Sequence, residues 1–344
     1  MFQVLQYFMK SVFKNPPVPL RLFILIGAVL IYGAFGFLYF ELSNNPELTL
    51  LDGFWYTVVT MTTVGYGDFF PKTTGGRFFV GWPVMIFGIG LLGYALSVIA
   101  ATLITAKSKE MKGMSSFKLK DHVVILNYPG LAKLEHLLRE LLLGPAGHRQ
   151  IVLVDEYLEE LPVELAKENM RFVRGNPVRD ETLSRASIDS ASHAVILCKN
   201  DGDTASDNLN VSITLAIEGR NRAINTVVEI VDPASEELLR KAGCDRVVCT
   251  ARFGAHFLSQ ELLNPGIQDV IEDLLSVQRG QNMYLVAITD TRPFGQVAEM
   301  CREKGHLAIG IRTSEKVLLN PEQSLTVKAG DRVITVGPEQ IVTV

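Results

Sequence analysis

Hydrophobic residues are concentrated near the beginning of this chain of 344 residues. Residues 22–40 and 78–106 are two apolar runs without a charged side chain. Each run is long enough to cross a bilayer core of about 30 Å. The segment between them, residues 49–70, is semi-polar and too short to span. This order of span, re-entrant segment and span predicts a membrane unit over residues 21–106.

The charges that flank the two spans predict the orientation of this unit. The connecting loop is more acidic, whereas basic residues precede the first span and follow the second: Lys10, Lys14, Arg21, Lys107, Lys109 and Lys112. Because such residues favour the cytoplasmic side, we expect a multi-pass protein of the inner membrane with both termini in the cytoplasm. Apolar and polar residues alternate in residues 1–20, which indicates a short helix lying along the surface of the lipid bilayer.

The hydrophobic period changes after a polar linker at residues 107–120. Short apolar strands then alternate with helical segments through residues 121–250, a pattern typical of a parallel, doubly wound, Rossmann-like sheet. Residues 251–278 and 279–344 follow this sheet. The predicted fold class is a two-span α-helical membrane unit joined to a Rossmann-like α/β domain. Ligands of such sheets bind beyond the carboxyl ends of the strands.

The composition argues against several other classes of protein. A net charge of -4 gives no indication of a nucleic-acid partner. No CxxC pair is present, so neither a zinc site nor a disulfide framework is expected from the four cysteines, which are Cys198, Cys244, Cys249 and Cys301. No pairing of a nucleophile with a base, and no pair of carboxylates, indicates an enzyme.

The re-entrant segment carries the residues with the clearest chemistry: Thr63, Val64, Gly65, Tyr66 and Gly67. A potassium ion that crosses lipid must exchange its hydration shell for other oxygens, and rings of backbone carbonyls can supply them. Such a backbone needs residues near the left-handed region, where glycine has no Cβ to clash. One copy cannot surround an ion, so we expect a homotetramer with potassium ions in the filter.

The stretch from Phe54 through Asp68 resembles the potassium-channel pore family. The resemblance implies that Trp55, on the pore helix, donates a hydrogen bond to Asp68 behind the filter. Val59 stands where some members have a glutamate, and Phe70 stands at the outer mouth. We predict that external tetraethylammonium blocks the pore through a cation–π contact with Phe70.

The second span contains three glycines within one and a half turns. A glycine in a helix interior is less favourable than an alanine by about 1 kcal/mol. Three glycines so close together therefore predict a bend in the helix or a close contact with another helix. In the resembling family a glycine here is the gating hinge, and Gly88 matches it best, with Gly90 and Gly93 nearby. Close packing between membrane helices is the alternative.

Residues 120–344 resemble the regulator-of-potassium-conductance (RCK) domain, most closely at residues 174–197. The resemblance implies a prokaryotic two-transmembrane potassium channel that is gated by an intracellular ligand. It also implies that crossing helices within residues 251–278, chiefly 255–274, clasp a neighbouring subunit, and that residues 279–344 form a small α+β C-terminal lobe. In this family eight such domains form a ring, which would here require additional RCK domains.

Two kinds of gating ligand follow from the RCK resemblance. For an adenine nucleotide or NAD, Asp155 stands where an acid meets a ribose hydroxyl, Asn176 replaces a second acid, and Asn127 replaces the first glycine of the phosphate-binding loop. For calcium, only Glu229 matches the acids of calcium-gated relatives. Asp201, Asp203 and Asp207 form an acidic loop nearby, for which a solvated turn that caps the following helix is the favoured alternative.

Other interpretations remain open from the sequence alone. A nucleotide-regulated subunit of a potassium uptake transporter would carry a similar cytoplasmic domain, although such proteins repeat the span–loop–span unit. A soluble nucleotide-dependent enzyme is disfavoured by the uncharged spans. Initiation at Met111 or Met114 would supply free cytoplasmic domains, and a longer natural chain with a second RCK domain would do the same.

Overall fold

The structure is a computed structural model that describes residues 17–144, 147–200, 202–277, 280–314 and 316–344. Contacts within the chain divide it into two units, Met1–Ser108 and Lys109–Val344. Most of the helix that we predict along the membrane surface, at residues 1–20, lies outside the described residues.

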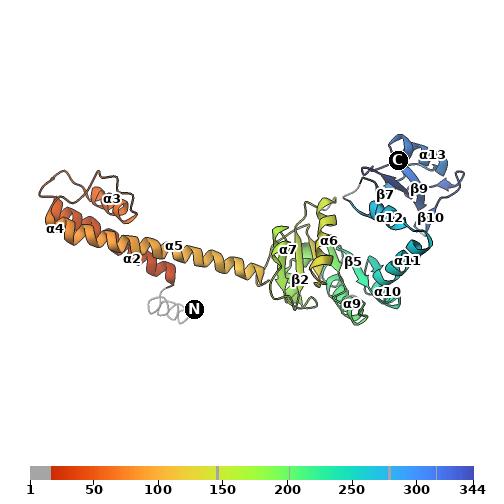
Figure 1. The fold of residues 1–344 in the computed structure, drawn as a ribbon, viewed down its shortest axis with the longest axis horizontal. Coiled ribbons are helices and arrows are strands. Elements are labelled where there is room, and N and C mark those ends of the chain that lie inside the picture. Colours follow the sequence, from red (N-terminus) through yellow and green to blue (C-terminus); the bar gives the residue numbers. More distant parts are fainter. Residues whose placement is uncertain (1–16, 145–146, 201, 278–279, 315) are drawn as a thin grey trace. The chain divides into compact units, whose positions relative to one another are not determined.

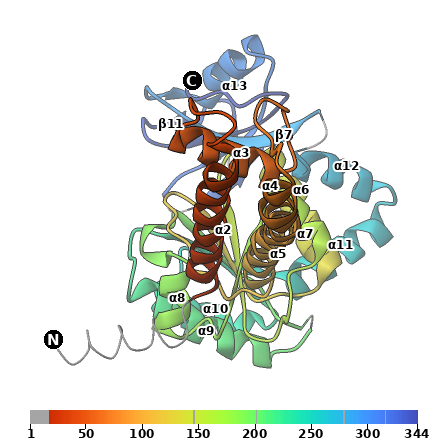
Figure 2. The same cartoon turned by 90° about the vertical axis from the view of Figure 1, so that its left-hand side faces the viewer.

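Helices make up the first unit (Figure 1): α2 (Val18–Glu41), α3 (Leu50–Met61), α4 (Thr74–Gly76), the π-helical turn η1 (Arg77–Gly81) and α5 (Trp82–Met111). Within this unit α2 and α5 run side by side, and α3 lies against α2 (Figure 2). Small residues allow α3 to lie close to α2, because a Cβ on Gly53 would lie only 2.8 Å from the carbonyl oxygen of Ala34. Both long helices are apolar enough to cross a membrane, and little of either is buried.

The second span differs from the sequence prediction at both ends. The described helix begins at Thr74, passes through the π turn η1 and ends at Met111, inside the predicted linker. Pro83 lies just after the π turn and cannot donate to the carbonyl four residues earlier, that of Phe79, which accepts from the Tyr32 hydroxyl instead. The helix continues beyond residue 106 because lysine, glutamate and methionine are good helix formers.

A six-stranded parallel sheet with the order β3-β2-β1-β4-β5-β6 forms the centre of the second unit. Its strands are β1 (Val123–Leu126), β2 (Ile151–Asp155), β3 (Arg171–Arg174), β4 (His193–Ile196), β5 (Asn225–Ile230) and β6 (Arg246–Cys249). The order reverses between β1 and β4, which places a switch point at their carboxyl ends. The predicted Rossmann-like fold class is confirmed.

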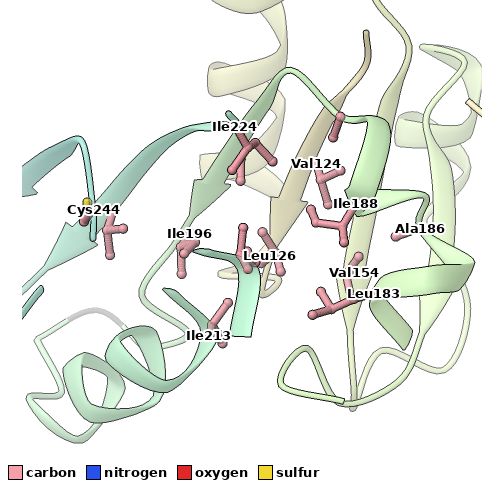
Figure 3. Close-up of a cluster of buried hydrophobic side chains, with 14 of the residues drawn as sticks. Val124, Leu126, Val154, Leu183, Ala186, Ile188, Ile196, Ile213, Ile224 and Cys244 are labelled. Atoms are coloured by element: carbon pink, nitrogen blue, oxygen red, sulfur yellow. The ribbon is translucent and has the colours of Figure 1, made fainter. Parts of the chain in front are cut away.

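Helices cover both faces of this sheet, as the nearly continuous burial of β1 and β2 requires. One face packs against α6 (Leu131–Leu143) and α7 (Val163–Lys167). The other packs against α8 (Asp180–Arg185), η2 (Ile188–Ser190), α9 (Ala205–Glu218) and α10 (Glu236–Lys241). The short turn η3 (Pro233–Ser235) precedes α10. Figure 3 shows the second core, in which Val124, Leu126 and Ile196 from the strands meet Leu183 and Ile213 from the helices.

The rest of the second unit consists of two helices and a small lobe. The helices are α11 (Thr250–Leu263) and α12 (Ile267–Leu275), and no residue of either is buried in the single chain. The lobe has an antiparallel sheet with the order β10-β9-β12-β7, a two-stranded pair, and a helix that packs on β9. Its elements are β7 (Asn282–Ala287), β8 (Arg292–Pro293), α13 (Phe294–Glu303), β9 (Leu307–Arg312), β10 (Val317–Leu319), β11 (Thr326–Val327) and β12 (Arg332–Gly337).

Candidate functional site

The re-entrant helix α3 is fixed at both of its ends. At its start, Thr49 and Asp52 form a capping box in which each side chain accepts from the other residue's backbone N–H. At its end, the carbonyl oxygen of Val59 accepts from the backbone N–H groups of Val64 at 3.0 Å and Gly65 at 3.3 Å. The helix therefore holds the first residues of the filter, and its carbonyl end carries partial negative charge that favours a cation.

The sign of φ alternates along the filter backbone. Thr63, Gly65 and Gly67 have φ of 63°, 58° and 80°, whereas Val64 and Tyr66, which lie between them, do not have positive φ. Such alternation turns successive carbonyls toward the same side of the strand, which regular β structure cannot do. One side of the segment can therefore present a row of carbonyl oxygens.

Aromatic residues support this segment from behind. The Trp55 indole Nε1 donates to Asp68 Oδ2 at 2.7 Å, and the Trp55 and Tyr66 rings stack with their centroids 5.9 Å apart. Asp68 Oδ1 also accepts from the backbone N–H of Phe69 at 3.0 Å. These contacts tie the end of the filter to α3, in the arrangement that the resemblance implied for Trp55 and Asp68.

Phe70 and Lys72, which follow the filter in the sequence, form a contact between a cation and an aromatic ring. Phe70 is half exposed, and the Lys72 ammonium lies 5.8 Å from the centroid of its ring. A cation therefore already lies near this ring in the single chain. An external quaternary ammonium would have to share or displace that contact.

The three glycines of α5 differ in their surroundings. Gly88 is buried, and a Cβ there would lie 2.5 Å from Met61 Cβ and 2.6 Å from Met61 Cα. Gly90 and Gly93 have nothing within 4 Å in the single chain. Packing against the end of α3 thus explains the glycine at position 88, and α5 is continuous through all three positions. A hinge at these glycines stays a prediction.

At the switch point of the sheet, two of the three residues proposed for a nucleotide are already bonded within the chain. Asp155 is 2% exposed, and its carboxylate accepts from the backbone N–H groups of Tyr128, Tyr157 and Leu158. Asn127 has φ of 70°, and its amide donates to the carbonyl of Leu197 at 2.9 Å and to Asn210 Oδ1 at 3.1 Å. The Asp155 carboxylate and the Asn127 amide nitrogen are therefore already engaged within the chain.

The acid proposed for calcium is bonded in the same way. Glu229 is 5% exposed, and its carboxylate accepts from Lys133 Nζ at 2.7 Å and from the Cys198 backbone N–H at 2.9 Å. Asp207 is 1% exposed and accepts from the backbone N–H groups of Val231 and Asp232, both at 2.9 Å. The Glu229 carboxylate is thus already paired with the ammonium of Lys133.

Burial and the neighbouring carboxylates of Glu229 and Asp207 raise the pKa of the Cys198 thiol to about 12. The thiol therefore stays protonated and can donate to the carbonyl of Glu229, 3.4 Å away. This cysteine is an uncharged member of the network and not a reactive thiolate.

The remaining candidates lie apart from this network. Asp203 is exposed and accepts from the Ala205 backbone N–H at 2.9 Å, which closes an Asx turn just before α9. Asn176 accepts from the Val178 backbone N–H at 2.9 Å, which closes the turn after β3. Asp201 lies outside the described residues. Among the described residues, no cluster of three or more histidine, cysteine or acidic side chains could hold a metal ion.

We call the bonded group at the carboxyl ends of the strands the crevice; its members are Asn127, Lys133, Asp155, Cys198, Asp207, Asn210 and Glu229. Asp207 was expected in an acidic loop, whereas Lys133 and Asn210 were not predicted from the sequence. A signal for Asn210 exists, since it lies three residues after Asp207 on α9 and therefore shares a helix face with it. Both are buried there. Lys133 could not be found in this way, because its partner Glu229 is distant in sequence.

Two family models match the chain. Residues 24–105 match the model described as "Ion channel", and residues 135–250 match the model described as "TrkA-N domain". The chain thus combines an ion-channel domain that crosses the membrane with a TrkA-N domain of the RCK type. Its homologues are prokaryotic potassium channels, a class of protein that is not enzymatic.

Two of these relatives illustrate the similarity. The chain is 27% identical to the putative potassium channel protein YugO of Bacillus subtilis, over 92% of this chain and 96% of that protein. It is also 27% identical to the calcium-gated potassium channel TvoK of Thermoplasma volcanium, over 81% of this chain and 80% of that protein.

Solved structures show a more distant similarity. The human SLO3 gating ring matches 63% of this chain with 18% identity and a TM-score of 0.50. The GsuK channel bound to NAD matches 91% of this chain with 17% identity and a TM-score of 0.47. The chain spans 44% and 56% of the length of these two chains.

Proposed function

We propose that four copies of this chain form a potassium-selective channel whose opening is controlled by an intracellular ligand. The observation that carries the proposal is the alternation of φ at Thr63, Gly65 and Gly67, in a segment between two membrane-spanning helices. One copy supplies one row of carbonyls, so several copies are needed to surround an ion. The names of the relatives as potassium channels support the choice of ion.

Exposed residues around the filter support a tetramer. Val64, Tyr66 and Trp55 are 53%, 69% and 45% exposed in the single chain. Irregular backbone at membrane depth is tolerated only where it is covered by protein or lines a water-filled path. Neighbouring copies would provide that cover.

The helices α11 and α12 support assembly of the cytoplasmic units. Leu258, Leu262 and Leu263 of α11 are 73%, 81% and 71% exposed. Exposed apolar groups of this size are typical of a protein interface. We assign to these helices the contact with a neighbouring RCK domain, and an eight-member ring would require four further domains beyond those of the tetramer.

Control by a ligand rests on the RCK domain and on the name of TvoK as a calcium-gated channel. The crevice does not select between calcium and an adenine nucleotide or NAD, because its acids are bonded internally. A ligand at Glu229 would have to displace Lys133, and one at Asp155 would have to displace backbone N–H donors. We therefore expect ligand binding to be coupled to rearrangement of these bonds.

The test is recording from reconstituted full-length protein in planar bilayers. With potassium on one side and sodium on the other, the reversal potential should show strong preference for potassium. Calcium, magnesium, ADP, ATP and NAD are then added in turn to the cytoplasmic side. Equal permeation of sodium would overturn the pore proposal. An open probability that no ligand changes would overturn ligand gating alone.

Assembly is tested on the same preparation. Mass measurement of the detergent-solubilised protein should give a multiple of four pore units, and a monomer or dimer would contradict the tetramer. The same spectra decide the origin of any extra RCK domains. A fragment beginning at Met111 or Met114 would support internal initiation, whereas full-length subunits alone would exclude it.

A further inference from the structure

The segment between α5 and β1, residues 112–121, is fastened to the cytoplasmic unit along its length, and we call it the strap. Gly113 has φ of 64° and closes α5, because its N–H donates to the Glu110 carbonyl while the N–H of Met114 donates to the Lys109 carbonyl. This pair of bonds is a Schellman cap, in which glycine is favoured at the left-handed position. The helix therefore ends at a defined residue.

The cap of α5 is bonded directly to the edge strand β3. The carbonyl of Gly113 accepts from the Arg174 backbone N–H at 2.9 Å. A Cβ on Gly113 would lie 2.3 Å from that same nitrogen, so no other residue fits there without displacement. The last turn of α5 is held as well, through an ion pair between Glu110 and Arg171 of β3.

Arg185, at the end of α8, joins the strap to β3. Its guanidinium donates to the carbonyls of Gly113 and of Ser115, the latter at 3.2 Å, and to the carbonyl of Arg174 at 3.0 Å. The side chain is partly buried, and a planar guanidinium can satisfy several carbonyls in a fixed geometry that lysine cannot reproduce. One side chain thus fixes the strap and the edge strand to each other.

Beyond Arg185 the strap remains attached. The Phe117 N–H donates to the backbone carbonyl of Arg185 at 3.0 Å, and the Phe117 ring packs against the core shown in Figure 3. The Ser187 hydroxyl donates to the carbonyl of Phe117, and the Ser190 hydroxyl donates to that of Leu119 at 2.6 Å.

Attachment along the whole strap has a mechanical consequence. A free segment of this length could extend by up to about 30 Å and would absorb movement of the domain that follows it. A fastened segment cannot, so displacement of β3 and α8 is passed to the end of α5. We propose that Gly113 and Arg185 form the joint through which the RCK domain acts on the inner helix of the pore. The proposal rests on the proposed function and makes Arg185 a positioning residue.

The chain contains a matched control for Arg185. Arg220, two residues after the end of α9, also makes several bonds to the region of α8: its guanidinium donates to both carboxylate oxygens of Asp189, at 2.9 and 2.6 Å, and to the Asp180 carbonyl at 2.9 Å. Among the described residues, the bonds of the Arg220 guanidinium go to Asp180, Ser184 and Asp189, none of which belongs to the strap. A general loss of stability around α8 would affect both arginine variants, whereas a loss of coupling would affect only Arg185.

The experiment compares Arg185→Gln, Arg185→Lys, Gly113→Ala and Arg220→Gln in full-length protein. Basal open probability is recorded in bilayers without added ligand, and hydrogen exchange of the Arg174 and Phe117 amides is measured on the same preparations. We expect Arg185→Gln and Gly113→Ala to speed exchange of these amides and to change open probability several-fold, with unitary conductance and ion selectivity unchanged. Arg185→Lys should be intermediate, and Arg220→Gln should match the wild type.

Three results would overturn the strap proposal. The first is faster hydrogen exchange of the strap amides without a change in open probability. The second is unchanged exchange of these amides in both Arg185→Gln and Gly113→Ala. The third is a change of open probability in Arg220→Gln as large as that in Arg185→Gln. Because Gly113→Ala leaves every arginine in place, it keeps the test informative if Arg185→Gln fails to fold. A wild-type channel that ignores all added ligands counts against ligand gating only, since the strap is tested on basal activity.

Discussion

The filter segment of the first unit and the buried acids of the Rossmann-like sheet differ in how their polar groups are satisfied. In the first unit, the filter residues Val64 and Tyr66 are exposed in the single chain, and the φ angles of their segment alternate in sign. In the second unit, the acids Asp155 and Glu229 are buried and bonded within the chain. The filter segment thus leaves side chains uncovered in the single chain, whereas the acids at the switch point already have partners.

The largest effect is expected in the filter, with Gly67→Ala. A Cβ at φ of 80° costs about 1–2 kcal/mol, and four subunits would multiply this to at least about 4 kcal/mol, or roughly 1,000-fold in the population of the conducting filter. We expect loss of potassium-selective current in bilayer recordings. Gly90→Ala is the control, because that helical glycine has nothing within 4 Å. Normal selectivity in Gly67→Ala would show that the backbone alternation is not required.

The next effect lies in the crevice, with Lys133→Met. Removal of the ammonium leaves Glu229 buried without its cation, and we expect a loss of about 2–3 kcal/mol in the stability of the second unit. This is below the usual value for a fully buried pair because Lys133 is one-third exposed. Thermal unfolding of the full-length protein measures it. Lys241→Met removes an exposed pair with Glu237 and should cost at most about 0.5 kcal/mol.

Equal melting temperatures for Lys133→Met and Lys241→Met would contradict the view that the crevice is closed by its own ion pair. A further comparison sharpens that test. Glu229→Gln leaves the ammonium of Lys133 with access to water, so its cost should be smaller, about 1 kcal/mol.

A smaller effect is expected behind the filter, with Trp55→Phe. The variant removes the indole donor 2.7 Å from Asp68 but keeps an aromatic ring beside Tyr66. A hydrogen bond to a carboxylate is worth about 1–2 kcal/mol, less where water can replace the donor. We expect conduction to persist and the current to decline several-fold faster under steady recording. Trp82→Phe is the control, and an identical decline in both variants would remove the support role of Trp55.

The smallest effect is expected at the outer mouth, where the filter meets solvent. Phe70→Val should weaken block by external tetraethylammonium about 2- to 5-fold, corresponding to a cation–π contact of about 0.5–1 kcal/mol. Lys72→Gln should strengthen block, because the Lys72 ammonium near the Phe70 ring is then gone. Dose–response curves in bilayers measure both. Unchanged block in Phe70→Val would refute the aromatic site.

Part of the filter and most of the fold class could be predicted because the signals are local. Spans are recognised from unbroken apolar runs, and the parallel sheet from the alternation of strands and helices. The positive φ of Gly65 and Gly67 follows from residue type. The positive φ of Thr63 does not, since threonine disfavours that region and is held there by its surroundings.

The crevice was predicted less well, because residue type at one position does not reveal its partner. The acids at Asp155 and Glu229 indicated ligand sites, yet both are bonded within the chain. The pairing of Lys133 with Glu229 joins α6 to β5, which approach each other only in the folded sheet. Gly88 similarly suggested a hinge, and the contact that explains it is with Met61 on another helix.

The sequence by itself determined the two spans, the filter motif and the doubly wound sheet, since each depends on neighbouring residues or on a short period. Only the tertiary structure decided that the crevice is closed and that the segment after Met111 is fastened to β3 and α8. The physical reason is that hydrogen bonds and ion pairs between distant residues require the chain to bring their atoms within about 3 Å, which no local pattern specifies.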